Sequence, residues 1–263
     1  MEEIVKSRIE RRRDDLLGKE FETNNCGKCF VIDYKGKEEV LVMFYEPMFV
    51  VTCALSSLKR GNVSNPFYPT VNGVGYLGVG DYNQAKNPLV STLWRNMLKR
   101  SYDESFHKKH PSYRNTTICK EWQNFQNFAE WCYSQKFFNA KDNKGSSYHL
   151  DKDILRKDNK IYSPETCCFI PQDVNKLLLK SNAIRGKYPI GVNLSKQGNS
   201  FVSTVTCENK SKFLGEYKTP EEAFLVYKQN KEWYIKEVAE KWRGKIGEAV
   251  YEALLQHEVH IDD

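Results

Sequence analysis

Three short alternating segments followed by a helix signal, all within residues 188–227, constrain the fold of this chain more than any other feature. Alternation of apolar and polar residues is typical of strands that bury one face. The turns between the segments contain Gln197-Gly198-Asn199 and Glu208-Asn209-Lys210, which suit tight chain reversals. The pattern therefore predicts a three-stranded sheet with strands at residues 190–194, 201–207 and 212–217.

The segment after the third strand carries a strong helix start. Thr219 stands at the N-cap, Pro220 at the first helical position and Glu222 at the third, which is the composition of a capping box. We expect a helix over residues 221–240. The residues expected to pack it against the sheet are Ala223, Phe224 and Tyr227.

Period-two alternation divides the strand residues between two faces of the sheet. The face expected to cover the helix carries Val192, Leu194, Val202 and Val205. The opposite face is then open to a partner. Its candidate contact residues are Asn193, Ser195, Lys196, Ser203, Lys210 and Lys212.

Positive charge is concentrated in the C-terminal part of the chain. The formal net charge is +6, yet residues 1–80 contain 11 basic and 11 acidic side chains. Residues 180–219 contain only Glu208 and Glu216 as acids, beside seven basic residues. Such a local excess is expected of a phosphate-binding face, although an ordinary surface with solvated lysines looks similar. The seven are Lys180, Arg185, Lys187, Lys196, Lys210, Lys212 and Lys218.

The C-terminal segment resembles the AP2-type DNA-binding domain over about 50 residues. The resemblance rests on Gly191-Val192, on Leu214-Gly215-Glu216-Tyr217 and on Thr219-Pro220-Glu221-Glu222-Ala223 followed by Tyr227. It implies that the sheet lies in the major groove of double-stranded DNA and that the helix packs behind it. Lysines would then contact phosphates, and Asn193 could pair with adenine. Plant members of that family use arginines and tryptophans here, so the resemblance implies no particular base preference.

Residues 148–175 combine two short apolar segments, a polar loop and a helix that starts after Pro171. His149, Asp151 and Asp153 would share one face of a strand. Carboxylate and amide oxygens suit a hard cation such as Mg²⁺, so the candidate metal ligands are Asp151, Asp153 and Asn175. His149 is the candidate base that would deprotonate water near neutral pH.

The same segment resembles the ββα-metal centre of HNH endonucleases from phages and mobile introns over about 30 residues. Asp151 matches the first metal ligand of that family and Asn175 matches the ligand on the helix. Lys152 stands where the family has its general-base His, and Thr166 falls near its supporting Asn. The resemblance implies metal-dependent DNA hydrolysis, with the catalytic role falling to Lys152 or to His149 as a displaced base. Because a lysine is a base only when its pKa is strongly lowered, a scaffold that has lost catalysis stays open.

The first 137 residues predict a mixture of strands and helices. A helix with few apolar positions is expected over residues 3–17. Strands expected at 29–34, 40–45 and 49–55 indicate a small sheet or barrel. Residues 61–80 are rich in Gly, Pro and Asn and predict a connector. Two helices are expected at 93–102 and 121–137, with a break at His107–Pro111. The aromatic residues of the second helix are expected in the core.

The hydropathy and the cysteine content indicate the cellular compartment in which the chain is expected. No apolar segment approaches the roughly 20 residues needed to cross a bilayer, and the charged N-terminus does not look like a secretion signal. We therefore expect a cytoplasmic protein without a membrane partner, in the host cell if a phage encodes it, with reduced thiols. Cys26 and Cys29 have the spacing of half a zinc site, but no second pair follows, so no structural zinc is expected.

Together these patterns predict a multi-domain α+β protein. The expected parts are an N-terminal β module in residues 1–80, helices with a ββα unit in 81–182, an AP2-like domain in 183–243 and a helical tail in 244–263. The tail would pair with another copy or pack on the same chain, and the oligomeric state is not predicted.

The function expected from these parts is binding of double-stranded DNA, combined with metal-dependent cleavage or nicking that would spread the chain's own gene or serve phage replication. A non-catalytic DNA-binding protein (a repressor or an architectural protein) is the first alternative. A module that contacts host proteins through the N-terminal sheet is the second alternative.

Overall fold

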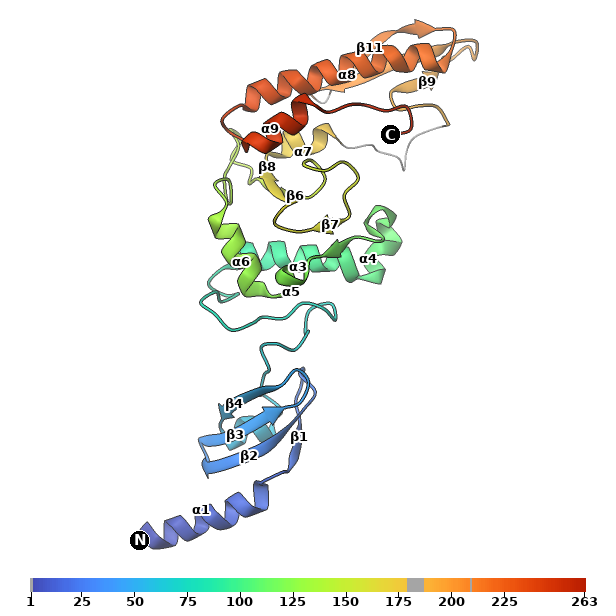
Figure 1. The fold of residues 1–263 in the computed structure, drawn as a ribbon. Helices are drawn as coiled ribbons and strands as arrows, with labels where there is room; N and C mark the ends of the chain where they lie inside the picture. Colours follow the sequence, from blue (N-terminus) through green and yellow to red (C-terminus); the bar gives the residue numbers. More distant parts are fainter. Residues whose placement is uncertain (1, 179–186, 209) are drawn as a thin grey trace. The chain divides into compact units, whose positions relative to one another are not determined.

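The computed structural model describes residues 2–178, 187–208 and 210–263 of the chain (Figure 1). Helices and several small sheets alternate along it, which confirms the predicted multi-domain α+β class. The chain divides into two compact units, one of Met1–Ser134 with Lys160–Ser163, and one of Gln135–Asn159 with Pro164–Asp263. The predicted charges Lys180 and Arg185, the turn residue Asn209 and the boundary at 182–183 lie outside the described residues.

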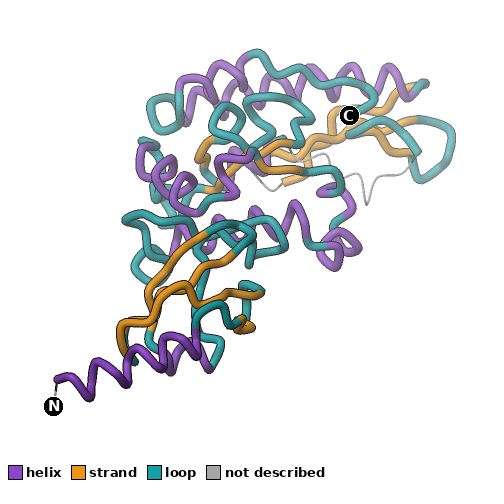
Figure 2. Tube along the Cα trace, turned by 60° about the horizontal axis from the view of Figure 1, so that its bottom comes forward, coloured by secondary structure: helices purple, strands orange, loops and turns teal. Residues whose placement is uncertain are grey.

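The first unit begins with helix α1 (Glu2–Leu16), which starts at the N-terminus marked in Figure 2. An antiparallel sheet in the order β1-β2-β3-β4 follows. Alternation places Val31, Val42 and Phe44 on a fully buried face, where Leu16 of α1 joins them. The predicted third strand ends early, at Cys53, and helix α2 (Leu55–Lys59) follows. The strands are β1 (Glu20–Glu22), β2 (Lys28–Gly36), β3 (Glu39–Phe44) and β4 (Phe49–Cys53).

Residues 61–80, all of which are described, contain turns and two isolated bridges, Val71 with Gly75 and Tyr76 with Asn124, but neither a helix nor an extended strand. The segment thus has the irregular backbone that its Gly, Pro and Asn content predicts, and it lies within the first compact unit. Asn65 anchors its start, because the side-chain amide donates to the Pro47 carbonyl at 2.8 Å and the side-chain oxygen accepts from the Phe67 N–H at 3.0 Å.

The helices of the first unit after residue 80 are more numerous than predicted, and the first of them starts five residues earlier than expected. Helix α3 (Pro88–Tyr102) ends at Asp103, whose side chain caps helix α4 (Glu104–Lys109), so the break predicted at His107–Pro111 lies too late. The second predicted helix is interrupted at Asn124. The elements that follow α4 are η1 (Pro111–Tyr113), β5 (Thr117–Ile118), α5 (Lys120–Gln123) and α6 (Phe125–Ser134).

The aromatic residues of α5 and α6 form a core, as predicted. Trp122, Phe125 and Phe128 are fully buried, and the Trp94 ring of α3 packs edge-on against Phe125 at a centroid distance of 5.4 Å. The indole N–H of Trp94 donates to the Trp122 carbonyl at 2.8 Å, which satisfies a polar atom inside this core. Strand β7 (Ile161–Tyr162) joins this unit by pairing in parallel with β5.

The second unit starts with the predicted ββα arrangement. Strands β6 (His149–Asp151) and β8 (Cys168–Ile170) pair antiparallel, and helix α7 (Gln172–Leu177) follows directly after Pro171. Leu150, Phe169 and Val174 are buried between the strands and the helix.

The C-terminal sheet has the order β11-β10-β9, with β9 (Val192–Leu194), β10 (Phe201–Cys207) and β11 (Lys210–Tyr217). This confirms the predicted three strands, and the third begins two residues earlier than expected. Helix α8 (Pro220–Trp242) packs on the sheet and starts with the predicted capping box, in which Thr219 accepts from the Glu222 N–H at 3.2 Å.

The C-terminal tail packs on its own chain. Helix α9 (Glu248–Leu255) lies against α8, with Val250 and Leu254 buried and the Tyr251 hydroxyl hydrogen-bonded to Glu240. Of the two alternatives for the tail, the structure therefore adopts the intrachain one. Across residues 2–178, 187–208 and 210–263, no helix combines the length and the apolar character that a membrane span needs.

Candidate nucleic-acid interface and metal-binding cavity

The contact between α8 and the C-terminal sheet depends on a glycine. Gly191 has a φ of +78°, in the left-handed region that side chains disfavour. A Cβ atom at this position would overlap the ring of Tyr227, which extends from α8 and is 5% exposed. Two of the residues that carry the AP2 resemblance therefore lie in direct contact, and the helix sits close to the sheet because position 191 has no side chain.

The strand register fixes which residues share the helix-facing side. Directly paired residues of antiparallel strands point to the same side. Val192 pairs with Ser203, and both are buried together with Val205. This side therefore packs against α8, as predicted for Val192 and Val205.

Four other placements on this sheet need correction. Ser203, expected on the open face, is fully buried on the helix side. Lys210 and Lys212 are exposed, but they pair with Cys207 and Val205, so their side chains leave the sheet on the helix side as well.

Val202 pairs with Asn193 and lies on the open face instead of covering the helix. Leu194 shares the helix side but remains 45% exposed. The reason is that apolar side chains stand at odd positions (Phe201 and Val205) and at an even position (Val202), so alternation alone did not determine which face is buried.

The open face of the sheet is polar and carries one large exposed aromatic ring. Thr204 pairs with Phe213, and Thr206 pairs with Ser211, so these four side chains share the side of Asn193. The ring of Phe213 is 62% exposed, an unusual position for a large aromatic residue. Of the predicted contact residues, Asn193 lies on this face, and Ser195 and Lys196 lie in the β9–β10 turn at its end.

Five exposed lysines surround this sheet. Among the described residues none of the five takes part in an ion pair. The acids near them are Glu208, bound by Lys241 at 3.5 Å, Glu216, bound by the Ser200 hydroxyl, and Glu222, which accepts the Lys218 backbone N–H at 3.1 Å. The rim of the sheet therefore carries a positive excess, while the open face itself carries one carboxylate, that of Glu216, which pairs with Val202. The five are Lys187, Lys196, Lys210, Lys212 and Lys218.

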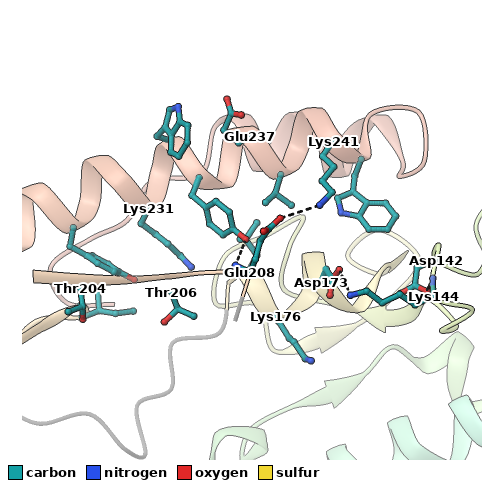
Figure 3. A pocket seen from close by; sticks show the side chains of 18 of the residues that line it. Asp142, Lys144, Asp173, Lys176, Thr204, Thr206, Glu208, Lys231, Glu237 and Lys241 are labelled. Carbon is teal, nitrogen blue, oxygen red and sulfur yellow. Dashed lines mark hydrogen bonds and ion pairs between the residues drawn. The ribbon is translucent and has the colours of Figure 1, made fainter. Parts of the chain in front are cut away.

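A cavity of about 1220 Å³ borders the β9 side of the same face (Figure 3). Thr204 and Thr206 of β10 line it together with Lys231 of α8 and Lys176 of α7. Burial lowers the pKa of Lys231. Four lysines and four acids line the cavity, and two ion pairs, Lys144–Asp173 at 3.4 Å and Lys241–Glu208 at 3.5 Å, balance part of this charge. The unobstructed part of the open face is therefore the β11 side, around Ser211 and Phe213.

The ββα unit positions Asp151 at the end of β6. Its Oδ1 atom accepts the backbone N–H groups of Asp153 at 2.9 Å and Ile154 at 2.8 Å, which closes the turn after the strand. Burial raises the pKa of this carboxyl, and the two N–H donors lower it in part. Among the described residues no hydrogen bond reaches Oδ2, so one oxygen of a desolvated carboxylate is available.

Asp151, Asp153 and Asn175 line one small cavity of about 70 Å³. This is room for about two water molecules. Two carboxylates and an amide oxygen are suitable ligands for Mg²⁺, and a cation would offset the desolvation of Asp151. The donor chemistry therefore fits a hard divalent ion. In the described part of the chain, no three His, Cys, Asp or Glu side chains are placed to share a metal ion. At this cavity the third ligand would therefore be the amide oxygen of Asn175.

Neither candidate base lines this cavity. Lys152 is buried, and its ammonium group contacts Asp153 and donates to the Asn159 carbonyl at 3.0 Å. His149 is exposed on β6 and does not line the cavity. Thr166 is buried beside the Cys167 sulfur at 4.0 Å. The structure thus brings together the three predicted metal ligands but neither predicted base.

Cys26 and Cys29 are buried in the core of the N-terminal module. Burial raises the pKa of Cys29 to about 11, so this thiol is protonated at neutral pH and packs as a small apolar group. The Cys26 sulfur lies 3.9 Å from the Asn65 carbonyl oxygen.

Sequence reasoning missed the outward side of β10 and β11. Thr204, Thr206, Ser211 and Phe213 were not among the predicted contacts, and only the alternation of Phe213 against Lys212 signalled one of them. A bulge changes the register between Ser203 and Thr204, so residues on either side of it cannot share one alternation pattern. Comparison of the chain with models of known protein families, with curated proteins and with solved structures finds no match.

Proposed function

We propose that this chain binds double-stranded DNA with the open face of its C-terminal sheet. The observation that carries the proposal is the composition of that face. Hydrogen-bonding side chains and the exposed ring of Phe213 lie at its centre, and the rim carries five lysines that form no ion pair with any described residue. Proteins that read DNA separate their contacts in this way, with cations on phosphates and polar or apolar groups on base edges.

The geometry of the sheet suits the major groove, which admits a two-stranded ribbon. Strands β10 and β11 form the longest pair of this sheet, and α8 supports them from behind. Ser and Thr hydroxyls bond to several base edges, Asn pairs with adenine, and Phe contacts the methyl group of thymine. Lys210 and Lys212 leave the sheet on the helix side, so they are suited to the phosphates beside the groove and not to the bases.

The test is fluorescence anisotropy of the full chain with a labelled duplex of random sequence and one rich in A·T, over a series of salt concentrations. We expect binding that weakens linearly with the logarithm of salt, because each neutralised phosphate releases counterions. Replacing Lys196, Lys210 and Lys212 by Gln should reduce the slope by about 2 to 3.

The matched control replaces Lys19, Lys37 and Lys59 by Gln. These lysines of the N-terminal module are exposed, and their replacement removes the same amount of positive charge. This control should leave the slope within error of the parent chain. A chain that does not bind either duplex at low salt would contradict the proposal.

A second candidate function is metal-dependent cleavage of the bound strand. The observation that favours it is the shared cavity of Asp151, Asp153 and Asn175. A divalent ion held there would stabilise negative charge at a phosphodiester. Asp151 and Asn175 would hold the ion, and Lys152 would orient Asp153 through their ion pair.

Conversion of supercoiled plasmid into nicked circle, with Mg²⁺ or with a chelator, tests this second function. Loss of nicking in Asp151→Asn and in Asn175→Ala, with duplex binding unchanged, would support it. Unchanged plasmid under every divalent metal, while the duplex is still bound, would leave the non-catalytic DNA-binding protein as the function. The position of Lys152, buried against Asp153 where a base would be needed, favours that outcome.

A further inference from the structure

The first unit carries a second basic surface, on the end of α3 and around α4 (Figure 1). Residues 95–114 contain six Lys and Arg residues and only two acids, Asp103 and Glu104. The β5–β7 pairing brings Lys160 to the same region, where its ammonium group donates to the Ser112 carbonyl at 3.2 Å. The α4 cluster is defined as Lys99, Arg100, Lys108, Lys109, Arg114 and Lys160.

Aromatic rings hold part of the α4 cluster in place. The Lys99 ammonium lies 5.9 Å from the centre of the Phe106 ring, and the Arg100 guanidinium lies 5.7 Å from the centre of the Tyr113 ring. The two rings pack edge to face at 5.6 Å, so both cations rest on one aromatic support. This contact holds two cations of α3 against rings from α4 and η1.

Asp103 and Glu104 offset only part of the charge of the cluster, and Lys99 acts on the Asp103 carboxylate. The Asp103 carboxylate is occupied at the start of α4, where it accepts from the Ser105 hydroxyl, the Ser105 N–H and the Phe106 N–H. Within the described part of the chain, Lys99, Lys108, Lys109 and Arg114 take part in no ion pair. Like charges that lie close together repel one another, and a polyanion would relieve that repulsion.

We propose that the α4 cluster binds the phosphate backbone of double-stranded DNA as a second, sequence-independent contact, an inference that rests on the proposed function of the C-terminal sheet. The chemistry selects the backbone over the bases. Phe106 and Tyr113 are partly buried, and cations cover their rings, so they do not offer a stacking platform. Exposed ammonium and guanidinium groups are suited to phosphate oxygens.

The test replaces Lys108, Lys109 and Arg114 by Gln in the full chain and measures duplex binding over a salt series. All three side chains are exposed, so the thermal unfolding midpoint should stay close to that of the parent chain. We expect the salt slope to fall by about 2 to 3, and affinity at low salt to fall by about 10-fold to 100-fold on random and A·T-rich duplexes alike. Lys19, Lys37 and Lys59 replaced by Gln again provide the control with an equal loss of charge.

The outcomes separate this inference from the proposed function. A parent chain that binds duplex, combined with an unchanged slope in the α4 variant, overturns the second contact and leaves the sheet contact intact. A parent chain that does not bind duplex overturns both. An α4 variant that keeps duplex binding but loses binding to single-stranded RNA or to phosphatidylserine vesicles overturns the assignment to DNA.

Discussion

The ring of Tyr227 lies against the backbone of Gly191, in the space that any side chain at position 191 would fill. Gly191 immediately precedes β9 and Tyr227 lies in the second turn of α8, and their contact sets the distance between sheet and helix. The open face of the sheet can approach a duplex only if the helix holds the strands from behind. The contact is therefore structural support for the proposed interface.

Gly191→Ala should destabilise the C-terminal sheet strongly. The new methyl group combines a strained φ of +78° with overlap of the Tyr227 ring. Gly198→Ala is the matched control, because Gly198 has a φ of +76° but a Cβ added there would meet nothing within 4 Å. We expect urea unfolding to show a free energy lower by about 1 to 3 kcal/mol for the first variant than for the second. Equal losses would show that the ring contact has no effect.

Ser203→Ala should keep or raise stability and should leave DNA binding unchanged. Ser203 is fully buried, and its hydroxyl has no hydrogen-bond partner among the described residues. An unsatisfied buried hydroxyl costs about 1 to 3 kcal/mol in desolvation, and its removal abolishes that cost. The outward Ser211→Ala is the comparison, because Ser211 is exposed on the unobstructed part of the open face, and its loss should weaken duplex binding without changing stability by more than about 0.5 kcal/mol. Weaker DNA binding by the stable Ser203→Ala variant would contradict the assignment of faces.

His257 should make the second unit less stable in mild acid. Burial lowers the pKa of His257 below its ordinary value of 6.5, and the Lys157 ammonium acts in the same direction. The unfolded chain therefore binds a proton at a higher pH than the folded chain does. Stability should rise with pH between the lowered pKa and 6.5, and it should fall as pH decreases through that window.

Replacing His257 by Gln should remove this pH dependence in urea unfolding. The control is His260→Gln, because His260 is exposed on the same tail. A parent chain and a His257→Gln variant with parallel stability profiles between about pH 5 and pH 7 would contradict the assignment.

The sequence predicted the C-terminal elements well because independent local signals agreed there. Gly198 marked the first turn, alternation marked the strands, and Thr219 with Glu222 marked the start of α8 within one residue. The capping box is readable because both of its hydrogen bonds join residues three positions apart. The three metal-ligand candidates also came together, since β6 ends at Asp151 and pairs with β8, and α7, which carries Asn175, follows β8 directly.

The faces of β10 and β11 could not be predicted from alternation. Apolar residues of β10 stand on both sides of the strand, at Phe201 and Val205 on one side and at Val202 on the other. The bulge after Ser203 also changes the register with β11. The α4 cluster was also missed, because Lys160 reaches it only through the β5–β7 pairing. Such long-range pairings leave no signal in local periodicity.

Photocrosslinking from the sheet to a bound duplex tests the central claim most directly. A benzophenone amino acid would replace Phe213, which is 62% exposed on the open face, and in a second variant Leu225, which is 56% exposed on α8. We predict crosslinks to a labelled duplex from position 213, abolished by high salt, and none above background from position 225. Crosslinks from position 225 alone, or from neither position while the duplex is bound, would contradict the account.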